Sequence, residues 1–240
     1  MEKMPLQNKF DWKKVTFHKL DSLEWVAIIL FWWLIIYPKP YQLLVGITLL
    51  LPILGLVING LKGRPSIASL VQIKNTEDEK YDVADFIDLP SYALTLRVLL
   101  DFEFDNYKSM LLPGLLGTVI VLLILLSTHR FIVLSKKNKW WIYISLFFNV
   151  FLYSFSATYG INCVYDNSEA KVYSAKVVDK HISEGRRHTT YYLKVTPWGH
   201  FRDPENISVS MEKYNQTETG QYVNIDLKEG VFNIPWYYIE

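Results

Sequence analysis

Three histidines in the last third of the chain are the residues best suited by type to bind a metal ion. His181, His188 and His200 are separated by seven and twelve positions, and these spacings match no standard zinc signature. His181 and His188 flank a predicted hairpin and can approach each other there, so they are retained as minor candidates for metal ligands. The alternative is that both are polar residues beside a turn, and we expect no metal or other cofactor.

Two groups of carboxylates are the other candidates for ligand chemistry. One group recurs at every third residue, and the other lines one face of a predicted strand. The groups are Asp82, Asp85 and Asp88, and Asp101, Glu103 and Asp105. Calcium takes several carboxylate oxygens, but neither group has the spacing of a calcium-binding loop. A solvated acidic surface is therefore the favoured interpretation.

Nucleophilic catalysis has less support in the residues. Cys163 is the only cysteine, which excludes an intramolecular disulfide. No Ser/His/Asp or Cys/His arrangement can be recognised. We therefore predict no catalytic residues and a protein that is not an enzyme.

The elements that must position these residues begin with long apolar runs. Half of the 240 residues are apolar, while the 25 basic and 24 acidic residues are concentrated between and after the runs. This layout is typical of an integral membrane protein with soluble parts, and it gives no reason to expect a nucleic acid as partner. The runs are Trp25–Tyr37, Tyr41–Asn59, Leu111–Ser127 and Trp140–Thr158. We expect four apolar helices in a lipid bilayer, of which three or four span it, because the first run is shorter than about 20 residues.

Two soluble parts are expected beside the helices. In the first, apolar and polar residues alternate from Leu94 to Asp105, which predicts a half-buried strand. Ser69–Asn75 is a second strand candidate, and Tyr81–Asp88 is predicted to form one acidic turn of helix. The expected division is a tail (1–24), a helical hairpin (25–60), a soluble insert (61–110), a second helical pair (111–160) with a basic loop (129–139), and a C-terminal domain (161–240).

The C-terminal domain is predicted to be all-β. Five short segments rich in Tyr, Val and Ile are separated by the Gly, Pro, Asp and Asn residues that turns need. The segments are Lys171–Ser183, Thr189–Trp198, Glu205–Met211, Gln221–Leu227 and Val231–Ile239. Five short strands cannot bury a face as one flat sheet, so we expect a small barrel of the OB or SH3-like kind.

The orientation in the membrane depends on the basic loop after the third run. Arg130, Lys136, Lys137 and Lys139 mark this loop as cytosolic, because short cytosolic loops are rich in Lys and Arg. The insert and the C-terminal domain would then both lie outside the cytosol. The N-terminal tail conflicts with this orientation, since four spans would also place its own lysines outside. Either the first run does not span, or the tail is translocated, or the whole orientation is inverted and both soluble parts are cytosolic.

Three hypotheses follow for the function. The leading one is an integral membrane protein that presents the C-terminal domain to a protein partner in the cell envelope, with an interaction surface at Arg186, Arg187, Tyr191 and Tyr192. A transport or channel component is disfavoured, because the apolar runs contain no ionisable residue between their ends. Asn149, the strongly polar residue deep in the fourth run, is expected to bond a neighbouring helix. The third hypothesis is a membrane-bound enzyme with a site between the insert and the C-terminal domain.

Several short motifs give the chain a resemblance. They are Asp166-x-Ser168, the VVDKHIS-x-GR hairpin, the Tyr191-Tyr192 pair, the closing Gly230-x-x-x-Ile-Pro-Trp236, and the stretches GRPSIASLV and DVADFIDLPSYALTLRVLLDFEF. In these motifs the sequence resembles uncharacterised bacterial multi-span membrane proteins that end in a small β domain. The resemblance implies a multi-pass protein of the bacterial inner (plasma) membrane with the β domain outside the cytosol. It implies no activity, substrate or catalytic residue.

Overall fold

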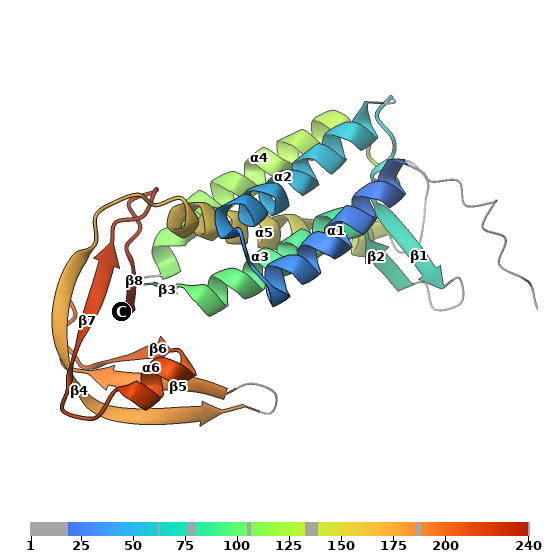
Figure 1. Cartoon of the computed structure of the whole chain (residues 1–240). Coiled ribbons are helices and arrows are strands. Elements are labelled where there is room, and N and C mark those ends of the chain that lie inside the picture. The colour runs from blue at the N-terminus through green and yellow to red at the C-terminus, as the bar shows by residue number, and fades with distance from the viewer. Residues whose placement is uncertain are drawn as a thin grey trace, which may run out of the picture.

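The computed structural model describes residues 19–61, 63–75, 80–104, 107–132, 139–185 and 189–239. These residues form a bundle of helices with a barrel-like sheet at one end (Figure 1). The bundle helices are α1 (Lys19–Ile36), α2 (Tyr41–Gly60), α3 (Asp85–Asp101), α4 (Leu111–Thr128) and α5 (Lys139–Val164).

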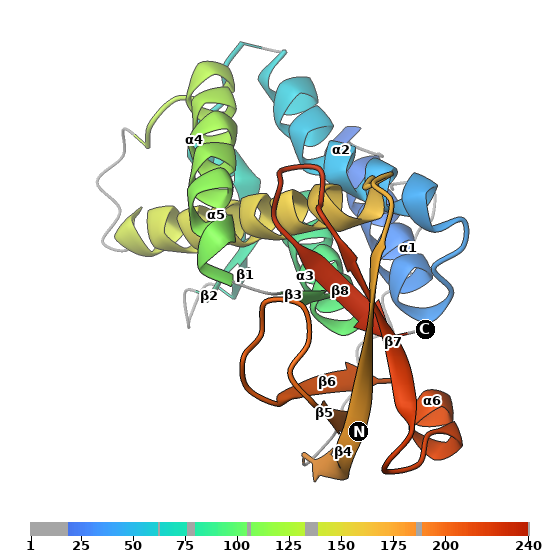
Figure 2. The same ribbon diagram turned by 90° about the vertical axis from the view of Figure 1, so that its left-hand side faces the viewer.

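Each bundle helix runs roughly opposite to the helix before it, and α5 is tilted across the others (Figures 1 and 2). The carboxyl ends of α2 and α4 therefore lie together, and we call this the basic end, after Arg64 and Arg130. The carboxyl ends of α1, α3 and α5 lie beside the sheet, and we call this the barrel end. It includes Tyr41, Asp101 and Val164.

Helix α3 replaces the strand that the alternation from Leu94 to Asp105 predicts, so that prediction is wrong. Leu94 and Val98 are buried, whereas Leu96 and Leu100 are exposed although they share the same parity. A spacing of four residues places Leu94 and Val98 on one helical face, and that face packs against α1, α2 and α5. Because the exposed face of α3 is also apolar, the sequence lacks the contrast between an apolar and a polar face by which a helical period is recognised.

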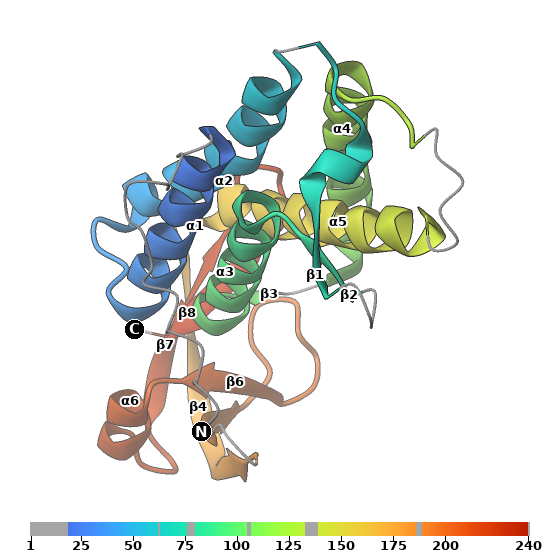
Figure 3. The ribbon, with the colours of Figure 1, turned by 90° about the vertical axis from the view of Figure 1, so that its right-hand side faces the viewer.

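The residues before α3 form a two-stranded antiparallel sheet at the basic end, visible beside α5 in Figure 3. Strand β1 (Val71–Asn75) confirms the strand predicted at Ser69–Asn75. Strand β2 (Lys80–Val83) takes the first half of the predicted acidic turn, and only the second half, from Asp85, is helical. Residues 61–110 thus run from the basic end to the barrel end of the bundle.

Small and hydroxyl-bearing residues let the bundle helices approach closely. A Cβ on Gly55 would lie 2.2 Å from the ring of Phe86, and a Cβ on Gly114 would lie 2.6 Å from the ring of Phe155. In the middle of the bundle, the hydroxyls of Thr95 and Ser156 share a hydrogen bond of 2.6 Å between α3 and α5. Close packing of small residues with hydroxyl bonds between helices is the usual way that helices associate in lipid.

The C-terminal domain is an antiparallel, nearly closed, barrel-like sheet of six strands in the order β3-β8-β7-β4-β5-β6. All five predicted strands are present, and a sixth, β3, comes from the segment after α3. The strands are β3 (Glu103–Phe104), β4 (Lys171–Glu184), β5 (Thr189–Val195), β6 (Glu205–Val209), β7 (Tyr222–Lys228) and β8 (Trp236–Ile239). A short helix, α6 (Met211–Gln216), occupies part of a predicted turn. The OB or SH3-like kind of barrel stays a prediction.

The lengths and apolar character of the helices bear on the membrane prediction. Within the described residues, three helical segments are long and apolar enough to cross a membrane: Tyr41–Gly60, Lys108–Thr128 and Trp140–Val164. A shorter apolar segment, Ser22–Ile36, lies in α1. All five bundle helices expose large apolar side chains on their outer faces, such as Trp32, Leu50, Leu99, Leu123 and Phe147.

Candidate functional site: a groove between the barrel and the bundle

A groove of about 800 Å³ lies between the two edge strands of the barrel, β3 and β6. The carboxyl end of α3, the start of β5, the start of α6 and strand β8 complete its lining. Its volume is within the range of about 300–1,000 Å³ that small-molecule sites usually have. The groove lies at the place where a site between the insert and the C-terminal domain was considered from the sequence.

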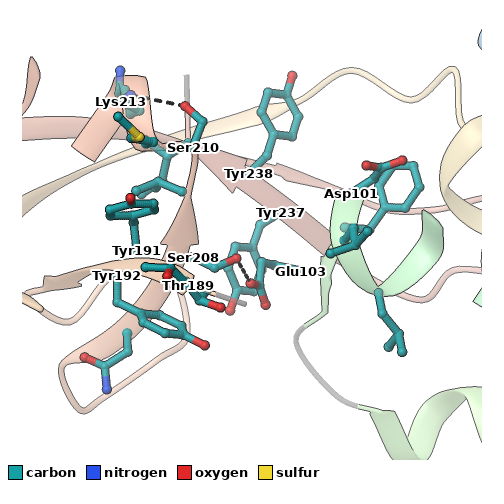
Figure 4. Close-up of a pocket in the computed structure, with 18 residues that line it drawn as sticks. Asp101, Glu103, Thr189, Tyr191, Tyr192, Ser208, Ser210, Lys213, Tyr237 and Tyr238 are labelled. Carbon is teal, nitrogen blue, oxygen red and sulfur yellow. Dashed lines mark hydrogen bonds between the residues drawn. The ribbon is translucent and has the colours of Figure 1, made fainter. Parts of the chain in front are cut away.

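One hydrogen bond joins the two edges across the groove. The hydroxyl of Ser208 on β6 donates to the carboxylate of Glu103 on β3 (Figure 4). Among the described residues, Glu103 has no salt bridge. The carboxylate therefore contributes a negative charge to the middle of the lining, together with the polar side chains of Asn206 and Thr189.

Two neighbouring tyrosines of β5 line the groove from opposite faces of the strand. Tyr191 points the same way as the buried Leu193, and its ring lies 5.2 Å from the ring of Tyr214. Tyr192 lies on the other face, opposite Ser208, and stacks on His181 at 5.0 Å with an interplanar angle of 13°. Both tyrosines of the predicted interaction surface therefore belong to the groove.

The remaining residues of that prediction, Arg186 and Arg187, lie outside the described residues, as does His188. His181 is exposed and its ring is stacked rather than directed at other ligands. His200 is likewise stacked, on Phe201 at 4.5 Å. In the described part of the chain, no group of three His, Cys, Asp or Glu residues is arranged to hold a metal ion. The pairing of His181 with His188 stays untested.

The predicted carboxylate groups do not form one site. Asp85 and Asp88 lie in the first turn of α3, where negative charge is favourable near the helix amino terminus. Asp101 and Glu103 have different partners, because Asp101 pairs with Arg97 while Glu103 accepts from Ser208. Asp105 and the side chain of Asp82 lie outside the described residues.

The end of α3 beside the groove carries a charge-balanced network. Arg97 and Asp101 form a salt bridge of 2.7 Å, and the hydroxyl of Tyr41 donates to Asp101 at 2.6 Å. The guanidinium of Arg97 also lies 5.8 Å from the centre of the Tyr41 ring. This network ties the start of α2 to the end of α3 and leaves little net charge at Asp101.

A second network fixes the barrel to the end of α5. Asp166 accepts hydrogen bonds from the backbone N–H of Ser168 at 2.8 Å, and from the backbone N–H of Gly230 and the indole N–H of Trp236 at 2.9 Å each. Partial burial alone would raise the pKa of Asp166, but these hydrogen bonds outweigh it and hold that pKa below its usual value.

Asn162, in the last turn of α5, completes this junction. Its side chain accepts from the N–H of Phe232 at 3.0 Å and donates to the carbonyl of Ile234 at 2.9 Å. Gly230 has a φ of +75°, and a Cβ there would lie 2.5 Å from the Asn162 amide. The motifs Asp166-x-Ser168 and Gly230-x-x-x-Ile-Pro-Trp236 therefore meet, and their contacts are those of a rigid junction.

The basic end is closed by two arginines that donate to backbone carbonyls. Arg64 donates to the carbonyl of Leu126 at 2.6 Å, and Arg130 donates to the carbonyl of Gly63 at 3.0 Å. The backbone N–H of Arg130 also donates to the carbonyl of Pro65 at 2.8 Å. Lys136 and Lys137 lie outside the described residues, as does the side chain of Lys139.

His129 is a buried polar residue at the same end, only 1% exposed. Thr128 donates its hydroxyl hydrogen to Ile124, so its oxygen is left to accept from His129 Nδ1 at 2.8 Å. Asn59 then donates to His129 Nε2 at 3.0 Å. Burial lowers the pKa of His129, which agrees with this neutral tautomer.

Asn149 is expected from the sequence to bond a neighbouring helix, but the structure gives its side chain a partner on its own helix. Its side-chain amide donates to Ser145 on its own helix at 3.0 Å, and its backbone carbonyl accepts from the hydroxyl of Ser91 on α3. The contact between helices is therefore made by the backbone of Asn149 rather than by its side chain.

Neither protein-family models nor curated proteins nor solved structures gave a match to this chain. The resemblance to bacterial multi-span membrane proteins stays a prediction.

Proposed function

We propose that the chain is a five-crossing membrane protein of a bacterial inner membrane that holds its barrel against the outer surface and presents the groove to a partner in the envelope. The observation that carries this proposal is the contact between the carboxyl ends of α2 and α4 through Arg64 and Arg130. If α2 and α4 both span, their ends lie on one side, so the chain between them must cross the membrane once more. Helix α3 is the segment available for that crossing.

The composition of α3 is compatible with a crossing. Asp85 and Asp88 lie in its first turn, Arg97 and Asp101 lie within its last five residues, and the stretch from Leu89 to Leu96 carries no charge. At about 1.5 Å per residue, its 17 residues extend about 25 Å. The Arg97–Asp101 salt bridge near one end reduces the cost of placing those charges close to the hydrocarbon.

Five crossings also remove the conflict over the N-terminal tail. With an odd number of crossings, the tail and the basic loop lie on the same side, and the barrel lies on the opposite side. Both lysine-rich segments then satisfy the positive-inside rule. The lysines of the tail are Lys3, Lys9, Lys13, Lys14 and Lys19.

The role of the bundle in this proposal is to fix the barrel in position. The barrel is held by the junction at Asp166 and also by β3, which continues from α3 and pairs with β8. Two covalent connections with hydrogen-bonded anchors restrict rotation of the barrel relative to the bundle. The groove is then presented in one orientation at the membrane surface.

Reporter fusions test the orientation. A reporter that is active only outside the cytosol should be active after Glu240 and inactive after Lys139. The opposite pattern would place the barrel in the cytosol and overturn the envelope role. Equal activity at both positions would contradict a crossing by α5.

A further inference from the structure

We infer that the groove binds the head group of a membrane lipid that donates hydrogen bonds, while an acyl chain of that lipid lies along the exposed face of α3. This inference rests on the proposed membrane placement of the bundle. It assigns the groove a ligand class, a lipid head group rich in N–H or O–H donors.

The acyl-chain part of the site is a stripe on α3. Tyr92, Leu96, Leu99 and Leu100 are exposed, and their spacings of three and four residues place them on one face of the helix. Leu99 and Leu100 also line the groove. The apolar stripe on α3 therefore reaches the lining of the groove, which is the arrangement that an amphiphile needs.

The head-group part of the site is rich in acceptors. The Glu103 carboxylate accepts a hydrogen bond from the hydroxyl of Ser208, and Asn206 adds an amide carbonyl to the lining. The ring of Tyr192 beside them offers a face on which a sugar or an ammonium group can lie. Lys213 of α6 also lines the groove, but on the side away from Glu103 (Figure 4). Beside Glu103, an anionic head group without donors would meet the carboxylate unfavourably, so the charge there favours an ammonium or a hydroxyl-rich head group.

The strand directions disfavour a peptide strand as the occupant. Five successive antiparallel pairings connect β3 to β6, so these two edges run antiparallel to each other. A strand inserted between them would have to lie parallel to one edge, which is the less stable pairing. It would also have to break the hydrogen bond between Ser208 and Glu103.

Native mass spectrometry of the full chain in mild detergent tests the inference with four dioleoyl lipids. Phosphatidylethanolamine and monogalactosyl-diacylglycerol carry donors and no net charge, and phosphatidylcholine carries no donor. Phosphatidylglycerol carries hydroxyl donors on a head group of net negative charge, so it tests the effect of the Glu103 carboxylate on an anionic ligand. We expect at least one of the first two to bind about tenfold more tightly than phosphatidylcholine and phosphatidylglycerol. Tighter binding of the ethanolamine lipid would identify an ammonium site, and tighter binding of the galactolipid would identify a sugar site.

Matched variants locate the binding in the groove. Glu103→Gln keeps an acceptor for Ser208 but removes the charge, and should weaken the preferred lipid about tenfold, whereas Glu184→Gln at the exposed end of β4 should leave it unchanged. Leu100→Ser should weaken binding more than Leu115→Ser on α4, although the two leucines are similarly exposed at 55% and 50%. If Glu103→Gln fails to fold, Tyr192→Ala replaces it with Tyr222→Ala as its control.

Equal affinity for all four lipids, or affinity that Glu103→Gln and Tyr192→Ala leave unchanged, would overturn the lipid site. That result leaves the proposed orientation of the barrel standing, because the reporter fusions test the orientation independently of lipid binding. Reporter fusions that contradict the crossing would overturn the placement even if a lipid still bound to the groove in detergent.

Discussion

The two ends of the helix bundle are stabilised in opposite ways, by side-chain hydrogen-bond donors at one end and by side-chain acceptors at the other. At the basic end, the side chain of Arg64 donates to the Leu126 carbonyl in the last turn of α4, and that of Arg130 donates to the Gly63 carbonyl just after α2. At the barrel end, the side chains of Asp166 and Asn162 accept from backbone N–H groups of the barrel. Cations at helix carboxyl ends are favoured by the helix dipole, and the positive-inside rule favours the same residues in the cytosol.

In the proposed orientation, this difference shows that one residue type, arginine, can serve two purposes at one end of the molecule. The arginines of the basic end close the bundle, and in the proposed orientation they also mark its cytosolic side. The acceptors of the barrel end carry no such topological signal, and their role is to hold a domain. Substitutions that separate these roles test the comparison.

The largest effect is expected at the barrel end from Gly230→Ala. The φ of +75° disfavours any side chain, and the new Cβ would also collide with Asn162. We expect a loss of about 3 kcal/mol in unfolding free energy, measured by denaturant unfolding in mild detergent. Gly220→Ala is the matched control, because its φ is +96° with open space around the Cβ, and should cost about 1 kcal/mol. Equal losses would contradict a tight junction at Gly230.

An intermediate effect is expected at the basic end from Arg64→Lys. The variant keeps the charge that marks the cytosolic side in the proposed orientation, but it loses the reach and planar geometry with which Arg64 bonds the Leu126 carbonyl. Unfolding free energy should fall by about 1 kcal/mol while the reporter pattern stays the same. Arg202→Lys in an exposed barrel loop should change stability by less than about 0.5 kcal/mol. A loss at Arg202 as large as at Arg64 would remove the case for a capping role.

The smallest effect is a pH dependence at the basic end. Because the pKa of His129 is lowered on folding, the unfolded chain binds more protons, and stability falls as pH drops below the ordinary value of 6.5. Between about pH 6.5 and about pH 5.5 the loss cannot exceed about 1.4 kcal/mol, since one site changes by at most one proton. Arg64, which donates to the backbone carbonyl of His129, adds a positive charge close to it.

Thermal unfolding of the wild type and of His129→Gln across this pH range provides the measurement. The variant should show a flatter pH dependence than the wild type. An unchanged slope would mean that another group titrates in this window.

The sequence correctly predicted the elements whose composition differs strongly from that of the residues that flank them. The apolar runs at α2, α4 and α5 and the strands of the barrel are framed by polar or turn residues, so their type and rough limits could be recognised. Helix α3 lacked that contrast, because Leu96 and Leu100 are apolar on its outer face while Leu94 and Val98 are apolar on its inner face. A pattern that is apolar on both faces can be fitted by a period of two as easily as by a helical period.

The groove was predictable only in part. The sequence places Tyr191 and Tyr192 in a predicted interaction surface, and both tyrosines line the groove. Glu103 and Ser208 were not connected, because they lie 105 positions apart and meet only when β3 joins the barrel through β8. The error at α3 hid this connection, since a strand running to Asp105 would not end in the two-residue β3.

The central claim is that α3 crosses the membrane, and the accessibility of two serines tests it most directly. In a Cys163→Ala background, Ser69→Cys lies before α3 and Ser109→Cys lies after it, and both serines are exposed. A membrane-impermeant maleimide applied to intact spheroplasts should label Cys at position 109, and should label position 69 only after permeabilisation. Labelling of both positions from the same side would contradict the crossing and restore an insert that lies wholly on one side of the membrane.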